Sequence, residues 1–180
     1  MLESPTDLVA GLLRPFPGSP CGLDLEYDAD FLELERLIQG RPQQQMGGAV
    51  VPGEEPAWNL VLDKAVALFA RTKDLRVALS LARARLPHGF AGLCEGLALV
   101  HGLVEQHWDQ VFPLLDPADG CDPTFRINII SGLCDAATFT DRVRGLPLVS
   151  SRSFGRFSLR DMAVVSGESP PLPGATPPAA

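Results

Sequence analysis

The chain has 180 residues, of which 46% are hydrophobic, and its 22 acidic and 15 basic side chains give a net charge of −7. This length predicts a single domain with a real core, and the hydrophobic content excludes disorder over most of the chain. Lys and Arg form no basic stripe, which disfavours nucleic acid and anionic membrane surfaces as partners.

The N-terminal part of the chain predicts helices joined by an irregular connector. Residues 4–7 read Ser-Pro-Thr-Asp, a helix-start pattern, so we expect a short helix that ends near Arg14. The connector covers residues 15–27, and Asp28 or Asp30 is expected to cap the next helix, which carries apolar residues at helical spacing.

Gly40 is expected to end that second helix. Residues 41–54 combine Gln, Gly and Pro without an apolar period, which predicts a mobile loop. An amphipathic helix then includes Trp58 and Phe69, and Asp74 is expected to cap the helix that follows it.

The longest helix is predicted over residues 90–108, after a break at Pro87. Its broad apolar face predicts a central position in the fold. One stripe of this face is formed by Phe90, Cys94, Leu97, His101, Val104 and Trp108, and it is widened by Leu93, Val100 and Leu103.

The pair Asp122 and Pro123 repeats the pattern of a helix start, and helix is expected to continue to about residue 143. Residues 146–151 and 157–160 are short extended runs that predict a β-hairpin packed on the helices. The core face of the helix is expected to comprise Phe125, Ile129, Ile130, Leu133 and Cys134.

These elements predict a mainly α fold, a bundle of about six helices around the 90–108 helix with a short C-terminal β-hairpin. The helical domain is expected to cover residues 1–165. Residues 166–180 are rich in Pro, Gly, Ser and Ala, which is typical of a linker, so we expect a further C-terminal region that is missing from this chain.

The sequence favours a cytoplasmic location. No basic segment followed by an apolar run opens the chain, and no stretch approaches the ~20 apolar residues of a membrane span, so direct membrane insertion is not expected. The cysteines are scattered without a C-x-x-C spacing, which predicts reduced, partly buried thiols; they are Cys21, Cys94, Cys121 and Cys134.

The connector carries acidic side chains at alternating positions, which resembles the start of an EF-hand loop. However, the sixth position counted from Asp24 is Ala29, where such a loop needs Gly, so a metal is not expected. Three alternatives remain: helix capping with surface charge, internal salt bridges with Arg, or a partner surface. The acidic residues are Asp24, Glu26, Asp28 and Asp30.

The sequence holds no catalytic or cofactor motif that we can identify. The histidines lack metal-ligand spacing, and His101 is expected in the core or at its edge. Cys94 and His101 lie two helical turns apart, a rise of ~10 Å that is too long for a hydrogen bond. The alternatives to a binding module are a small α-helical enzyme that uses carboxylates near residues 24–30 and a purely structural spacer.

Arginines gather late in the chain, whereas acids gather early. This segregation indicates either an internal electrostatic clasp between the connector and the hairpin or a solvated face. Trp58 and Trp108 are either core anchors or exposed interface residues. The late arginines are Arg126, Arg142, Arg144, Arg152, Arg156 and Arg160.

An ordered set of motifs extends over most of the chain. It comprises P-C-G-x-D-L-E-Y-D-x-D-F at 20–31, K-D-L-R-V at 73–77, W-D-x-V-x-P-x-L-D-P at 108–117, D-P-T-x-R-x-N at 122–128 and F-S-L-R-D at 157–161. This set resembles the ImpA-type N-terminal domain of TssA proteins, which are assembly factors of the bacterial type VI secretion system.

The resemblance implies a non-enzymatic adaptor that contacts baseplate, membrane-complex, sheath or tube components. It also implies that the full-length protein forms a ring-shaped homo-oligomer through a C-terminal region absent here, so that many weak arms bind with high avidity. No cofactor is expected. The motif positions that we single out as partner-binding candidates are Asp24, Glu26, Tyr27, Asp28, Arg76, Trp108, Asp109, Asp116, Arg126 and Arg160.

Overall fold

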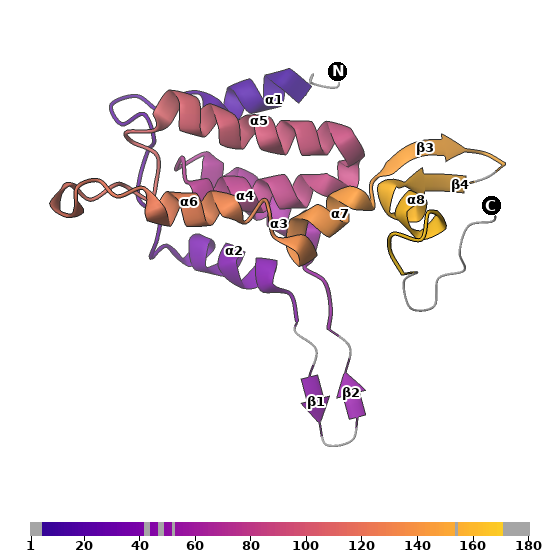
Figure 1. Cartoon of the computed structure of the whole chain (residues 1–180). Coiled ribbons are helices and arrows are strands. Elements are labelled where there is room, and N and C mark those ends of the chain that lie inside the picture. Colours follow the sequence, from indigo (N-terminus) through magenta and orange to yellow (C-terminus); the bar gives the residue numbers. More distant parts are fainter. Residues whose placement is uncertain (1–4, 42–43, 47–48, 52, 154, 171–180) are drawn as a thin grey trace.

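The computed structural model describes residues 5–41, 44–46, 49–51, 53–153 and 155–170 (Figure 1). The fold is mainly helical with a short antiparallel hairpin near the C-terminus, which confirms the predicted class. The α-helices are α1 (Pro5–Leu13), α2 (Ala29–Gln39), α3 (Trp58–Phe69), α4 (Leu75–Arg85), α5 (Gly89–His107), α6 (Thr124–Ser131), α7 (Asp141–Arg144) and α8 (Leu159–Val165). Shorter helical turns are η1 (Leu86–His88), η2 (Pro117–Asp119) and η3 (Ala136–Thr140), and the strands are β1 (Gln44–Met46), β2 (Ala49–Val51), β3 (Pro147–Ser151) and β4 (Gly155–Ser158).

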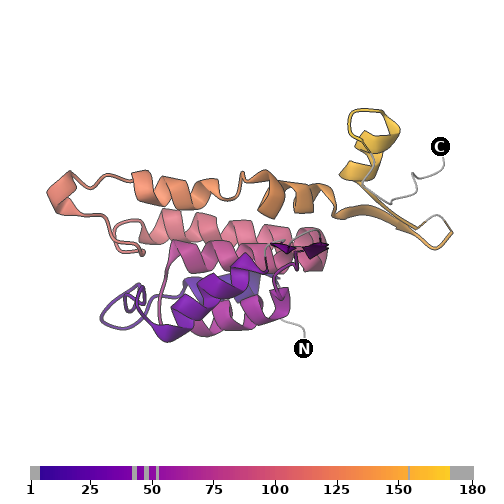
Figure 2. The ribbon, with the colours of Figure 1, turned by 90° about the horizontal axis from the view of Figure 1, so that it is seen from below.

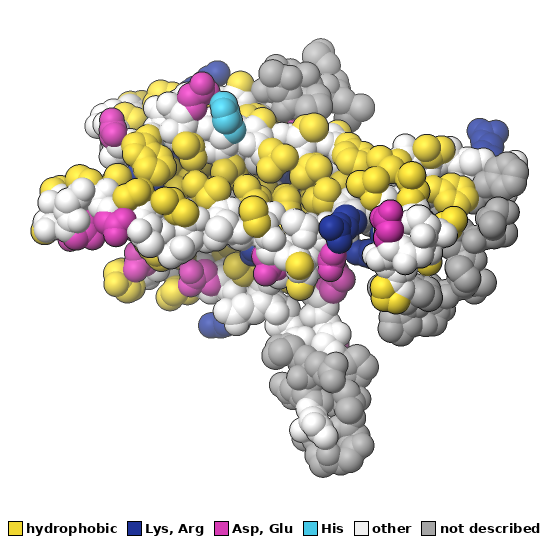
Figure 3. Space-filling model, viewed as in Figure 1, with side chains coloured by type: hydrophobic (Ala, Val, Ile, Leu, Met, Phe, Trp, Pro, Cys, Tyr) yellow, Lys and Arg dark blue, Asp and Glu magenta, His cyan; other side chains and the backbone are white. Residues whose placement is uncertain are grey.

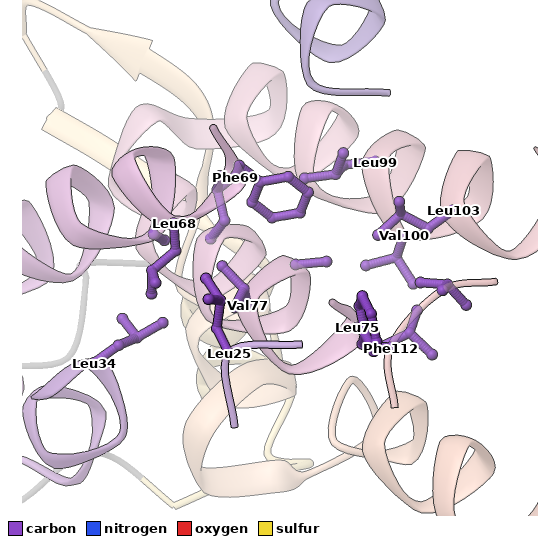
Figure 4. Close-up of a cluster of buried hydrophobic side chains, with 14 of the residues drawn as sticks. Leu25, Leu34, Leu68, Phe69, Leu75, Val77, Leu99, Val100, Leu103 and Phe112 are labelled. Atoms are coloured by element: carbon purple, nitrogen blue, oxygen red, sulfur yellow. The ribbon is translucent and has the colours of Figure 1, made fainter. Parts of the chain in front are cut away.

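Helix α4 lies at the centre of the bundle and packs against both α3 and α5 (Figure 1). It is buried on nearly all sides, because Ala78, Ser80 and Ala82 are small enough for neighbouring helices to approach closely. The expectation that the 90–108 helix is central is therefore wrong, although α5 is the longest helix. Figure 4 shows the surrounding core, which includes Leu34, Leu68, Phe69, Leu75, Val77, Leu99 and Leu103.

The buried face of α5 is rich in glycine. It includes Val100 and Leu103, which we expected to widen the apolar face, but it leaves out most of the predicted stripe. A Cβ at Gly96 would lie 2.7 Å from the Cα of Ala82, and one at Gly92 would lie 2.0 Å from the carbonyl oxygen of Arg85. These close approaches turn Leu99 and Leu103 towards α4. The predicted stripe instead faces outward, and its exposed members are Phe90, Cys94, Leu97 and His101.

The predicted N-caps are confirmed where the local sequence alone decides them. The Asp28 side chain accepts a hydrogen bond from the Asp30 backbone N–H at 2.9 Å. The Asp74 side chain does the same for Arg76 at 2.7 Å. Gly40 ends α2 at a φ of 58°, which glycine adopts without steric cost.

We had expected a loop over residues 41–54. The segment instead contains β1 and β2, which pair as an antiparallel hairpin. Strands of three residues are too short to show an apolar period. Arg41 and Glu54 close the base of the hairpin through two backbone hydrogen bonds, at 3.0 and 2.8 Å. The predicted cap Ser4 lies outside the described residues.

Helix α6 begins after Pro123, as predicted, but it ends at Ser131 and does not continue unbroken to residue 143. The η3 turn and α7 follow it as separate pieces. The predicted core face is confirmed in part: Ile129, Ile130 and Leu133 pack against the core. Phe125 and Cys134 are exposed instead, and Arg126 is fully buried.

The C-terminal hairpin is confirmed, with β3 and β4 paired antiparallel, and it lies with α8 beyond the end of the bundle (Figure 2). Residues 157–160 are not all extended, however. Ser158 forms a reciprocal capping box with Asp161 and starts α8. Of the predicted linker, residues 171–180 lie outside the described residues.

The cysteines differ from the expectation of partly buried thiols. All are free, and Cys21 is buried in the core. The other three, Cys94, Cys121 and Cys134, are exposed.

Candidate functional site

Three of the sequence motifs, at 20–31, 73–77 and 108–117, meet at one end of the bundle. The Lys73 N–H donates to the Cys21 carbonyl at 2.8 Å, and the Phe112 N–H donates to the Lys73 carbonyl at 2.9 Å. The Leu75 N–H in turn donates to the Phe112 carbonyl at 2.9 Å. We call the segments joined in this way, residues 20–27, 72–76 and 108–113, the motif junction.

Gly22 shows why the first motif needs its glycine. Its φ is 77°, and a Cβ there would lie 2.2 Å from the carbonyl oxygen of Arg71. No other residue fits this turn without moving the backbone. The glycine therefore allows the connector to reach the start of α4.

Lys73 is a buried ammonium group within the junction. Its Nζ lies 4.2 Å from the ring centroid of Phe16 and 5.6 Å from that of Phe69, and it donates to the Phe69 carbonyl at 3.4 Å. Burial lowers the pKa of Lys73 and raises the pKa of the Cys21 thiol, because desolvation disfavours the charged form of each group.

Arg126 holds the third segment of the junction. From α6 it donates to the carbonyls of Pro113 at 2.8 Å and Val111 at 2.7 Å, and also to that of Trp108. Its guanidinium carbon lies 4.8 Å from the centroid of the Trp108 ring. Desolvation lowers the pKa of Arg126. This arginine is therefore a structural clamp on the loop after α5.

Three of the four alternating acids, Glu26, Asp28 and Asp30, form internal salt bridges, and Asp28 also caps α2, so two of the three alternatives hold. Arg71 binds Asp28 and, at 3.1 Å, Asp30. Arg76 lies 3.5 Å from Glu26 and donates to Asp74 at 2.7 Å. The Arg71 hydrogen bond is the main reason that the pKa of Asp28 lies below its usual value.

The electrostatic clasp with the late arginines is wrong, since no ion pair among the described residues joins them to the connector. Arg142 lies 4.0 Å over the Trp58 ring and donates to the Arg83 carbonyl at 3.2 Å. Arg160 donates to the carbonyl of Asp141. Both tryptophans, Trp58 and Trp108, are half-buried with an arginine on the ring, so they anchor the fold.

The remaining candidates are at the surface. Asp24 accepts from the Glu26 N–H at 3.0 Å, and Asp116 accepts from the Ala118 N–H at 2.8 Å as the cap of η2. Tyr27 is 89% exposed, and Asp109 is also exposed. The structure thus places Glu26, Arg76 and Trp108 in the motif junction, where Arg126 contacts the 108–113 segment, and it pairs Asp28 with Arg71.

The described residues contain no group of three or more His, Cys, Asp and Glu side chains that could hold a metal ion. His101 is exposed beside Glu105, at 3.7 Å, so it is not in the core as we had expected. A hollow of about 420 Å³ is lined in part by Asp30 and Glu33, and both carboxylates pair with Lys64, at 3.0 and 2.6 Å.

A second hollow, of about 540 Å³, lies between α1 and α5 and is mainly apolar. Its carboxylate is Glu95, which is buried and bound to Arg85. The geometry therefore places no pair of free carboxylates beside a histidine in either hollow.

Figure 3 shows a continuous band of hydrophobic side chains over α5 and α6. On α5, the residues at positions 90, 93, 97 and 104 share one face at helical spacing, and Leu97 is 41% exposed. On α6, Ile127 is 55% exposed and lies one turn before Ile130. We call this surface the apolar band. It comprises the exposed Phe90, Leu97 and Ile127 and the half-buried Leu93, Val104 and Ile130, which also pack against the core.

The sequence identified the α5 part of the apolar band but assigned it to the core. The signal that could have corrected the assignment is the glycine spacing at 92 and 96, which marks the side where another helix comes close. Contiguous exposed apolar side chains are uncommon on soluble domains and mark interaction sites.

The fold and its surface define a helical domain whose ionisable motif residues largely stabilise the fold and whose apolar band faces solvent. The model of the family "ImpA, N-terminal, type VI secretion system" matches residues 15–135. The chain belongs to this family, as the motif resemblance predicted. None of the helices among the described residues is both long and apolar enough to cross a bilayer.

Two relatives agree with this assignment. The chain is 52% identical over 161 residues to the type VI secretion system component TssA1 of Pseudomonas aeruginosa, covering 89% of this chain and 45% of that protein. It also matches the solved N-terminal domain, including the ImpA_N region, of the Burkholderia cenocepacia TssA component, with a TM-score of 0.66 and 29% identity. That match covers 88% of this chain and 58% of the other. The chain thus spans less than half the length of its curated relative.

Proposed function

We propose that this domain is a non-enzymatic assembly module of the type VI secretion apparatus that acts from the cytoplasm. It binds a baseplate, sheath, tube or membrane-complex component during assembly of the secretion tail. The family membership supports a role in type VI secretion, and the apolar band supports binding to another protein as the way in which the domain acts.

The single observation that carries the proposal is how the ionisable motif residues are used. Arg76, Asp28 and Arg126 are engaged in pairs, caps and carbonyl clamps. Groups engaged in this way shape a surface and are not available for proton transfer to a substrate. Four of the candidate residues, Asp24, Tyr27, Asp109 and Asp116, are exposed and so remain available for contact with a partner.

We further propose that the longer protein forms a ring through a region outside this chain. Each domain then needs only modest affinity, because linked copies raise the effective concentration at the partner. A fused C-terminal oligomerisation region should therefore strengthen binding by a factor of about 10² or more over the isolated domain.

The test is direct binding of the purified chain to each purified baseplate, sheath, tube and membrane-complex protein from the same bacterium, measured by biolayer interferometry. Saturable binding to at least one component is expected. A heat-unfolded sample of the same chain serves as the control. If no component binds, either to the chain alone or to the longer ring-forming protein, the module is a spacer and the proposal fails.

A further inference from the structure

The charge around the apolar band differs between its two ends. Beside the N-terminal end of α5, α7 carries Arg142 and the exposed Arg144, and its Val143 shares a hydrophobic cluster with Leu93. The C-terminal end of α5 and the loop before α6 carry charge of one sign. Between residues 89 and 140, the single Lys or Arg is Arg126, which is fully buried. Glu95 in the same stretch is also buried and is bound to Arg85. The exposed charged side chains there are all acidic: Glu105, Asp109, Asp116, Asp119, Asp122 and Asp135.

From this combination we infer that the apolar band binds an amphipathic α-helix of a partner protein, whose apolar stripe is flanked by Lys and Arg where it meets the C-terminal end of α5. The stripe from Phe90 to Val104 covers 14 residue steps, a length of about 21 Å at the rise of an α-helix. A partner helix of about four turns matches that length. Its own apolar side chains recur at the spacing of three and four residues that the α5 face presents.

Charge complementarity indicates whether the partner helix is basic or acidic. Acidic side chains at the C-terminal end of α5 and in the loop before α6 attract a basic flank and repel an acidic one. A second copy of this chain is a poor occupant, because a symmetric contact centred on this end would place like charges opposite each other. An acidic partner helix is disfavoured for the same reason.

This inference rests on the proposed function, since it names the chemistry of the partner that the assembly module binds. Its experiment needs no secretion component, so the two proposals can fail separately. The probe is a fluorescein-labelled 18-residue peptide in which Leu forms an i, i+3, i+4 stripe and Lys occupies the flanks. Binding to the full chain is measured by fluorescence anisotropy at 50 and 300 mM salt.

Two matched peptides isolate the two features of the partner. One keeps the Leu stripe and replaces each Lys by Glu, and the other scrambles the Leu/Lys sequence so that no stripe remains. The Leu/Lys peptide should bind saturably, and each control peptide should bind at least tenfold more weakly. Binding of the Leu/Lys peptide should be several-fold weaker at 300 mM salt than at 50 mM salt. If the scrambled peptide binds as tightly, charge attraction alone explains the binding and the inference is overturned.

Neutral substitutions then locate the contact. Leu97→Ser and Ile127→Ser should each weaken binding of the Leu/Lys peptide at least tenfold. Both side chains are exposed, so the variants should keep the fold, and circular dichroism checks this. The matched control is Leu60→Ser on α3, a leucine 55% exposed outside the apolar band, which should change binding less than twofold. The assignment is refuted if all three variants lose peptide binding equally, or if neither Leu97→Ser nor Ile127→Ser loses it. It is also refuted if the chain self-associates with rising concentration and this blocks the peptide.

Discussion

Arg126 offers the sharpest test of how the motif junction is held together. We expect Arg126→Met to destabilise the fold strongly, because the side chain is fully buried and donates to three carbonyls of the loop after α5. One of these carbonyls belongs to Val111, which is itself fully buried, so its lost partner is not replaced easily by water.

The magnitude follows from two opposed effects. A hydrogen bond to a charged donor contributes about 1.5–3 kcal/mol, and three such bonds are lost. Removing the guanidinium also relieves the cost of burying a charge that no carboxylate neutralises, which offsets part of that loss. The net decrease in the free energy of unfolding should therefore be about 3–5 kcal/mol.

Urea unfolding followed by circular dichroism measures this loss. With a denaturant slope of about 2 kcal/mol per molar, the midpoint should fall by about 2 M. Arg126→Lys should recover only part of the stability, because an ammonium group cannot spread its donors over three separated carbonyls. Arg156→Met on β4 is the matched control at an exposed site and should stay within about 0.5 kcal/mol. A loss below about 1 kcal/mol for Arg126→Met would refute the clamp.

Two further substitutions test the helix contact and the buried lysine. Gly96→Ala should destabilise the fold by about 1–3 kcal/mol in urea, because its Cβ meets the α4 backbone, whereas Gly11→Ala, with no atom within 4 Å, should stabilise it by up to about 1 kcal/mol. If Gly96→Ala and Gly11→Ala change the free energy of unfolding in the same direction, the close packing of α4 and α5 is contradicted. Lys73→Met should be at least as stable as the wild type at pH 7, and any advantage should shrink as the pH rises towards 10. The folded-state pKa of Lys73 is lowered, so below the unfolded-state value the unfolded wild type binds more protons and wild-type stability rises with pH. Urea titrations of both proteins across this range check the slope, and parallel curves would show that the lysine is not desolvated.

Short-range features could be read from the sequence because neighbouring residues decide them. Asp28 and Asp74 cap their helices through hydrogen bonds that span two residues, and Gly40 stops α2 through its own backbone freedom. The capping box from Ser158 to Asp161 was equally local, but the extended run before it led us to predict strand instead of α8. The hairpin within residues 41–54 left no apolar period to detect.

The candidate site was only partly predictable. The motifs located the residues of the junction, but their spacing could not show that Arg126 turns inward onto three carbonyls or that Arg71 and Arg76 pair with the connector. Those contacts join segments that are far apart in the sequence, and several partners of the same charge were available to each group.

The sequence by itself determined the helical class, most helix boundaries and the family, because these depend on local caps, periodicity and an ordered set of motifs. Only the tertiary structure decided which face of α5 is buried. Gly92 and Gly96 let α4 come closer than a leucine face allows, and this contact leaves Phe90 and Leu97 in solvent. Periodicity identifies the two faces of a helix, but the choice between them depends on the shape of the neighbouring helix, which the sequence of α5 does not contain.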